Sequence, residues 1–124
     1  MNSADDLEIF VRDCSLAEIR RWLSTIFGAV SEFEDIGAGL ICRAGDGRFI
    51  ITPSIEHGPY TSIWFAKPGT PWRSDADCAR QAARQLGVTV RCDPGEEYSD
   101  VDPYSPVMLE ISSGTERLVT WEDA

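Results

Sequence analysis

The apolar residues of this chain recur at two spacings, and each spacing predicts one kind of element. Apolar and polar side chains alternate over 7–13 and 61–67, which is typical of strands with one buried face. Each stretch is followed by one with apolar residues three or four positions apart, over 16–28 and 75–87. That spacing puts the apolar side chains on one side of a helix. Each half of the chain is therefore expected to begin with a strand and a helix.

Both predicted helices carry signals at their ends. The first follows Ser15, whose hydroxyl can accept a hydrogen bond from an early helix N–H while Glu18 reaches back to the Ser15 amide. The second follows Ser74, which can cap in the same way. Gly28 and Gly87 close the two helices, because glycine leaves a helix through the left-handed region at little cost.

After each helix come a short strand and two apolar runs joined by a tight turn. The paired runs are GLICRAGDGRFIIT at 39–52 and VMLEISSGTERLVTW at 107–121, and their glycine-containing turns predict two β-hairpins. The order strand, helix, strand, strand, strand thus occurs twice, which suggests an internal repeat. We expect an α+β fold of two βαβββ modules, residues 1–56 and 57–124, with mixed curved sheets and one helix per module in one compact domain. Chance likeness of two α+β stretches is the alternative.

Composition and charge narrow the class of protein. Of 124 residues, 43% are apolar, which is enough for a packed core. No apolar run approaches the length of a membrane span, and the N-terminal residues lack a basic and apolar leader, so we expect a cytoplasmic protein. The net charge of −10 opposes binding to nucleic acid. It favours either simple solubility or attraction to a basic protein or a cationic small molecule.

The residue patterns of common catalytic and zinc sites are missing. The four cysteines include no C-x-x-C pair, and His57 is the only histidine. We expect Cys78 and Cys92 to be small core residues and His57 to lie in an exposed turn. The sequence also lacks a phosphate-binding glycine loop and a nucleophile elbow.

Three short stretches resemble the vicinal oxygen chelate superfamily, which includes glyoxalase I, extradiol dioxygenases and bleomycin-resistance proteins. They are Val11-Arg12-Asp13 before the first helix, LSTIFG at its end, and RLVTW in the last strand. The resemblance implies paired βαβββ modules, a cleft and frequent homodimers.

Metal-using members of that superfamily place His, Gln or Glu on the first and last strands of each module. The matching positions here hold Glu8, Ser62, Thr52 and Trp121, and Glu122 is the only other nearby acid. The remaining metal site is one of two carboxylates, Glu8 and Glu122, so a metal-dependent lyase or dioxygenase is our third hypothesis. No imidazole falls on a predicted strand. We therefore expect no metal, cofactor or catalytic residue, as the resemblance implies for the antibiotic-binding branch.

Phe10 and Trp64 occupy equivalent positions on the first strands of the two halves. If both helices cover one side of the sheet, these rings point to the other side, where they can hold a planar or cationic ligand. The predicted ligand-binding set is completed by polar neighbours and loop aromatics: Glu8, Ser62, Glu110, Trp72 and Tyr104. The two loop aromatics are expected at a cleft mouth or a dimer contact. In the alternative, the rings fill a closed interface between the halves.

These features favour a metal-free protein that binds a cationic or aromatic small molecule without transforming it, like bleomycin-resistance-type sequestering proteins, and that forms a homodimer. The runner-up is an acidic immunity or interaction protein that masks a basic protein partner. That hypothesis depends on the net charge and on the turn-rich segment 93–104, called the acidic segment below. The carboxylates of this segment are Asp93, Glu96, Glu97, Asp100 and Asp102, and its tyrosines are Tyr98 and Tyr104.

Overall fold

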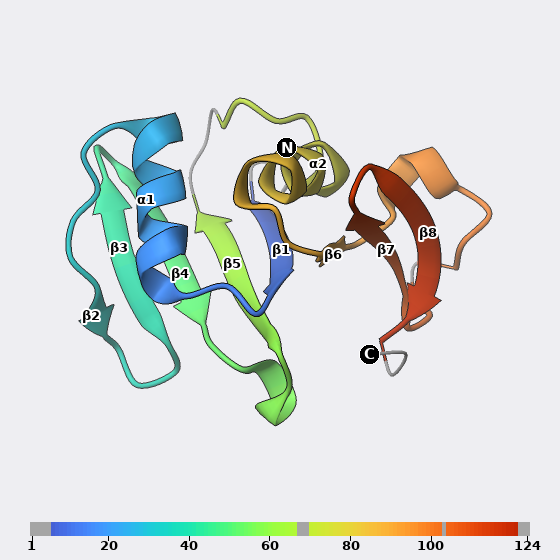
Figure 1. Cartoon of the computed structure of the whole chain (residues 1–124), viewed down its shortest axis with the longest axis horizontal. Coiled ribbons are helices and arrows are strands. Elements are labelled where there is room, and N and C mark those ends of the chain that lie inside the picture. The colour runs from blue at the N-terminus through green and yellow to red at the C-terminus, as the bar shows by residue number, and fades with distance from the viewer. Residues whose placement is uncertain (1–5, 67–69, 103, 122–124) are drawn as a thin grey trace.

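The computed structural model describes residues 6–66, 70–102 and 104–121, which form two helices and one antiparallel sheet of eight strands (Figure 1). The helices are α1 (Leu16–Phe27) and α2 (Asp75–Leu86), and two short 3-10 turns are η2 (Ile55–His57) and η3 (Gly95–Tyr98). The strands are β1 (Asp6–Arg12), β2 (Glu34–Asp35), β3 (Leu40–Ala44), β4 (Gly47–Thr52), β5 (Tyr60–Ala66), β6 (Val90–Cys92), β7 (Val107–Ser112) and β8 (Thr115–Thr120).

The order of strands across the sheet is β2-β3-β4-β5-β1-β6-β7-β8. The first strands of the two halves, β1 and β5, pair along their whole length, from Asp6 with Ala66 to Arg12 with Tyr60. That long pairing merges the halves into one sheet. The expectation of mixed sheets is wrong, because every described strand pair is antiparallel. The sheet order also differs between the halves, since β4 lies beside β5 whereas β8 lies at an edge.

Local signals set most of the elements. Ser15 and Glu18 form the expected capping box at the start of α1, and Ser74 caps α2. Both hairpins form where the glycine turns predict them. The stretch after α1 is the exception, because only Glu34–Asp35 pairs as a strand. Its earlier part is held by Arg20, whose guanidinium donates to the carbonyl oxygens of residues 30 and 31, and by one backbone hydrogen bond from the N–H of Ser31 to the carbonyl of Arg43 on β3.

Both helices cover the same face of the sheet, as expected, and Figure 1 shows them in front of it. The core beneath α1 is rich in aromatic rings. Trp22 packs against Phe65 and Trp72, and Phe27 against Phe49. Under α2 the contacts come from small residues, which let the helix lie close to β1, β6 and β7. They include Cys78 and, on β6, Cys92, both fully buried as expected. His57 is exposed, also as expected.

Neither helix exceeds 12 residues, and among the described residues no helix has the length and apolar character to cross a membrane.

Candidate functional site

Phe10 and Trp64 lie on neighbouring strands and on the face away from the helices, as the alternation predicts. Both are half-buried. They are not directly opposite each other, because Phe10 faces Ser62 across the strand pair and Trp64 faces Glu8. The closest ring to Phe10 among the described contacts belongs to Trp121, with the centroids 5.1 Å apart in an edge-to-face arrangement. Phe10 thus packs against its own chain.

The two polar residues beside these rings bond to each other. Ser62 is buried, and its Oγ donates to Glu8 Oε2 at 2.5 Å. One carboxylate oxygen of Glu8 is therefore already engaged. The alternative site of two carboxylates needs Glu122, which lies outside the described residues.

Glu110 is the centre of a buried charged cluster that the sequence did not reveal. Its Oε2 accepts from Arg91 Nε at 3.0 Å, and its Oε1 accepts from Arg117 Nε at 2.9 Å. Arg91 is fully buried, and its guanidinium lies over the rings of Tyr60 and Trp121. Burial would raise the pKa of Glu110, but the hydrogen bonds from Arg117 and Arg91 outweigh it, so this pKa lies below its usual value. Glu110 is thus a structural counterion, and the middle of this face is closed.

The two loop aromatics separate. Trp72 is not at a cleft mouth: it lies on the helix side of the sheet, stacked on Trp22 with centroids 5.9 Å apart, and its Nε1 donates to Gln81 Oε1 at 2.8 Å. Residues 70–74 before α2 fold inward because the large ring of Trp72 packs against α1 and bonds to α2. Tyr104 is 96% exposed and lies in the acidic segment. Sequence alternation could not place either residue, since both fall outside regular elements.

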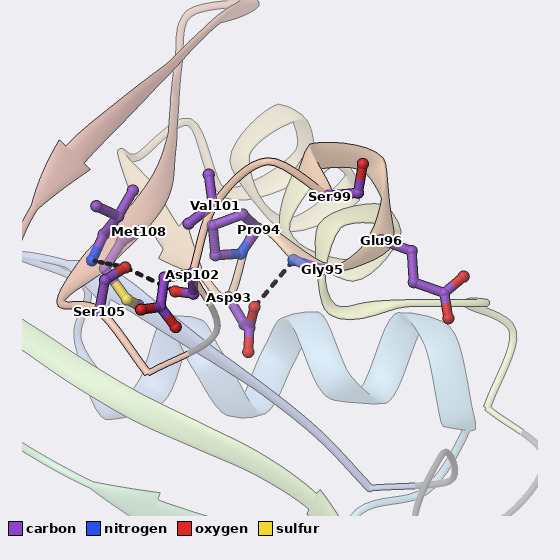
Figure 2. A pocket seen from close by; sticks show the side chains of 10 residues that line it. Asp93, Pro94, Gly95, Glu96, Ser99, Val101, Asp102, Ser105 and Met108 are labelled. Carbon is purple, nitrogen blue, oxygen red and sulfur yellow. Dashed lines mark hydrogen bonds between the residues drawn. The ribbon is translucent and has the colours of Figure 1, made fainter.

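A pocket of about 440 Å³ lies between the acidic segment and the start of β7 (Figure 2). Its floor is formed by buried or half-buried apolar residues, Pro94, Val101, Val107 and Met108. Its rim is formed by the exposed acids Asp93, Glu96 and Asp102, and the lining also includes Gly95, Ser99 and Ser105. None of these lining residues is basic. The pocket contains none of the seven residues predicted from the sequence, although three of its acids belong to the segment noted for its charge.

Two tight turns shape this pocket. Asp93 accepts a hydrogen bond from the N–H of Gly95 at 2.9 Å, and Asp102 accepts one from the N–H of Tyr104 at 2.9 Å. Each aspartate uses one oxygen to hold its own turn, which leaves its charge at the rim. In the view of Figure 2 the Asp93 and Asp102 carboxylates point the same way. The turns could be predicted from the sequence, but the apolar floor could not, because Val101 and Met108 come together only in the folded chain.

Arg80 on α2 holds the acidic segment through an ion pair. Its Nη2 donates to Glu97 Oε1 at 2.5 Å, and its Nε donates to Glu116 Oε2 on β8 at 2.7 Å. Asp77 lies at 3.4 Å from the same guanidinium. Three carboxylates therefore surround one arginine, so this cation does not neutralise the pocket rim.

Asp75, at the start of α2, extends the negative region inward. Burial raises the pKa of Asp75 to about 6, and the charges of Asp93 and Glu8 add to this effect, although the N–H of Glu8 donates to Asp75 Oδ1 at 3.4 Å. Acidic side chains from α2 and β8 thus add to the negative charge of the acidic segment. The arrangement suits a ligand that carries positive charge.

Within residues 6–66, 70–102 and 104–121, no cluster of three or more His, Cys, Asp or Glu side chains could hold a metal ion. What the geometry offers is a pocket with an acidic rim and an apolar floor. Comparison with known proteins adds no relative: no family model, no curated protein and no solved structure matches this chain.

Proposed function

We propose that this protein binds a cationic ligand in the pocket between the acidic segment and the start of β7, without transforming it. The observation that carries the proposal is the composition of that pocket. Three carboxylates stand at the rim of an apolar hollow, and no lining residue supplies a compensating positive charge. A ligand that joins a cationic group to an apolar group can contact the carboxylates at the rim and the apolar floor at the same time.

The volume of about 440 Å³ lies within the range of small-molecule pockets, roughly 300–1,000 Å³. This volume supports the proposal that the ligand is a cationic aromatic small molecule, which is the ligand expected of a sequestering protein. The net charge of −10 supports a second source of the same chemistry, an arginine or lysine side chain of a basic protein. Both ligands place a charged group at the rim and apolar atoms on the floor.

The relation to the vicinal oxygen chelate superfamily is part of the same proposal. The order strand, helix, strand, strand, strand in both halves supports it. The unequal sheet neighbours of β4 and β8 do not follow from a two-module repeat. A homodimer and a cytoplasmic location belong to this proposal, and so does the absence of a metal. The proposal of a cation pocket does not depend on the superfamily relation, the homodimer, the cytoplasmic location or the absence of a metal.

Calorimetric titration with benzamidine tests the proposal, and neutral benzamide serves as the nearly isosteric control. We expect benzamidine to bind at least about tenfold more tightly than benzamide, because one favourable charge interaction of about 1.4 kcal/mol changes affinity tenfold. Binding should weaken as salt is raised.

Paired variants place the binding in the pocket. Asp93→Asn and Asp102→Asn retain the oxygen that holds each turn and remove only the charge, so their combination should weaken benzamidine binding tenfold or more. Asp35→Asn is the matched control, because Asp35 holds the N–H of Gly37 in the same kind of turn beside β2. Loss of binding in Trp64→Ala, with binding retained in the Asp93 and Asp102 variants, would move the site to the face of Phe10 and Trp64 and overturn the proposal.

A further inference from the structure

β8 is the long free edge of the sheet. The opposite edge, β2, has only two residues, whereas β8 has six. The side chains of Thr115 to Leu118 are exposed, and Leu118 is among the few large apolar residues at the surface, at 43% exposure. An exposed edge strand can template the addition of a further strand.

The hairpin register shows which backbone groups of β8 point away from β7. Ser112 and Thr115 flank a two-residue turn, and the pairing continues through Glu110 with Arg117. In an antiparallel hairpin with such a turn, hydrogen-bonded pairs alternate from the turn outward. The N–H of Trp121 donates to the carbonyl of residue 106, which fits this register. The backbone N–H and C=O groups of Glu116 and Leu118 therefore point outward, and no described residue is recorded as bonding to them.

The charged side chains of β8 do not protect this edge. Charged residues usually discourage strand addition by reaching out over the edge. Here Glu116 is turned back to Arg80 on α2, and Arg117 is turned to Glu110 on β7. The edge is left with Leu118 and the outward backbone groups around it.

This edge continues into the acid-rimmed pocket. A second hollow of about 480 Å³ is lined by Leu118, Val119 and Thr120 of β8 together with Asp100. Its remaining lining residues, Val101, Asp102, Ser105 and Val107, also line the first pocket. The two hollows therefore form one acidic surface beside β8, with carboxylates of Asp93, Glu96, Asp100 and Asp102 and no basic lining residue.

We propose that an extended, basic segment of a partner protein adds to β8 as a ninth strand and places its arginine or lysine side chains in the two hollows. This inference rests on the proposed function and names the carrier of the cation. Backbone hydrogen bonds to Glu116 and Leu118 supply affinity, and the carboxylates select positive side chains. Charge argues against a second copy of this chain, since β8 pairing with β8 would bring two acidic surfaces together.

The test uses a fluorescently labelled, capped decapeptide of alternating arginine and threonine, measured by anisotropy. Two further peptides carry N-methyl groups, one on every arginine and one on every threonine. In a bound strand only one of these two sets of amides faces β8. We expect one methylated peptide to bind at least tenfold more weakly than the parent, and the other to stay within about threefold of it.

Two variants of the protein test the edge itself. Leu118→Pro removes an outward N–H and leaves the β7 pairing intact, and Leu118→Lys adds a positive charge at an exposed position. Both should weaken binding of the parent peptide tenfold or more. Leu118→Pro adds no charge and should leave benzamidine binding in the first pocket unchanged, because Leu118 does not line that pocket. Thermal melts check that both variants are folded.

Each outcome is decisive. Equal binding of the two methylated peptides, or peptide binding that ignores both Leu118 variants, would overturn strand addition and leave the cation pocket standing. A dimer detected by light scattering that Leu118→Pro dissociates and that the peptide cannot displace would make a second copy the occupant of β8 and overturn the proposal. Failure of both benzamidine and peptide to bind would remove the proposed function together with this inference.

Discussion

Arg91 on β6 and Glu110 on β7 form a buried ion pair, with side chains only 1% and 8% exposed and Arg91 Nη2 3.0 Å from Glu110 Oε2. The pair lies on the face away from the helices, and the Arg91 guanidinium lies over the rings of Tyr60 and Trp121. Two charges removed from water are tolerated only because each meets its partner at short range. This pair explains why the middle of that face is packed rather than open.

Removing one member of the pair should be costly. We expect Glu110→Ala to lower the free energy of unfolding by about 3–5 kcal/mol, because Arg91 is left buried without its carboxylate. Arg117→Ala is the control, since Arg117 bonds to the same carboxylate from a side chain that is 67% exposed, and it should cost less than about 1 kcal/mol. Urea unfolding of both variants measures the difference. An equal loss of unfolding free energy in the two variants would show that burial does not determine how much these ion pairs stabilise the protein.

The strands, helices and hairpins could be predicted because their signals are local. The capping residues Ser15 and Ser74, and the glycine turns of the hairpins, act within a few positions of the chain. The side of the sheet that Phe10 and Trp64 occupy also follows from alternation along one strand. Such features need no knowledge of which strands meet.

The sheet order and the pocket could not be predicted, because both depend on contacts between distant residues. Nothing in β1 indicates that it pairs with β5 on one side and β6 on the other. Arg91 is an ordinary polar position of a short strand until Glu110 and Tyr60 surround it. The pocket likewise needs Met108 to meet the turns of Asp93 and Asp102. Charge alone pointed to the acidic segment.

Trp72 and Tyr104 should differ sharply in their effect on stability. Trp72 is 8% exposed and packs against Trp22, Phe27 and Phe65, so Trp72→Ala should cost about 3–5 kcal/mol. Tyr104 is 96% exposed, and Tyr104→Ala should change stability by less than about 0.5 kcal/mol. Thermal unfolding of the two variants provides the comparison. A small effect at Trp72 would contradict its position in the core.

Arg80 should restrain the motion of the acidic segment and contribute little to the stability of the rest of the protein. Arg80→Gln removes the guanidinium that joins Glu97 to Glu116, a network worth about 1 kcal/mol at this degree of exposure. Hydrogen exchange of amides 95–98 should accelerate roughly fivefold, the factor that corresponds to about 1 kcal/mol, while amides of β1 and β5 stay unchanged. Arg84→Gln on the same helix is the control, because Arg84 is exposed and makes no recorded ion pair with a described residue. Uniform acceleration in both variants would indicate that Arg80 does not act on this segment.

Asp75 should make the protein less stable as the pH rises from about 4 to 6. Burial raises the pKa of Asp75 to about 6 in the folded chain, above the value of 3.8 expected for the unfolded chain. Below both values the carboxyl is neutral in either state and costs nothing. Between them the unfolded chain ionises first, so folding is disfavoured, and above about pH 6 the full cost persists.

Asp75→Asn removes this titration and keeps an oxygen for the N–H of Glu8. A shift of about two units corresponds to at most about 3 kcal/mol, and loss of a favourable charge at the start of α2 reduces the gain to about 1–2 kcal/mol at pH 7. Urea unfolding of both proteins at pH 4, 5, 6, 7 and 8 measures it, and only the difference between them isolates Asp75 from the other carboxylates. That difference should be small at pH 4, grow through pH 5–6 and then level off. A difference independent of pH would mean that Asp75 is solvated and that the negative region around the pocket ends at its rim.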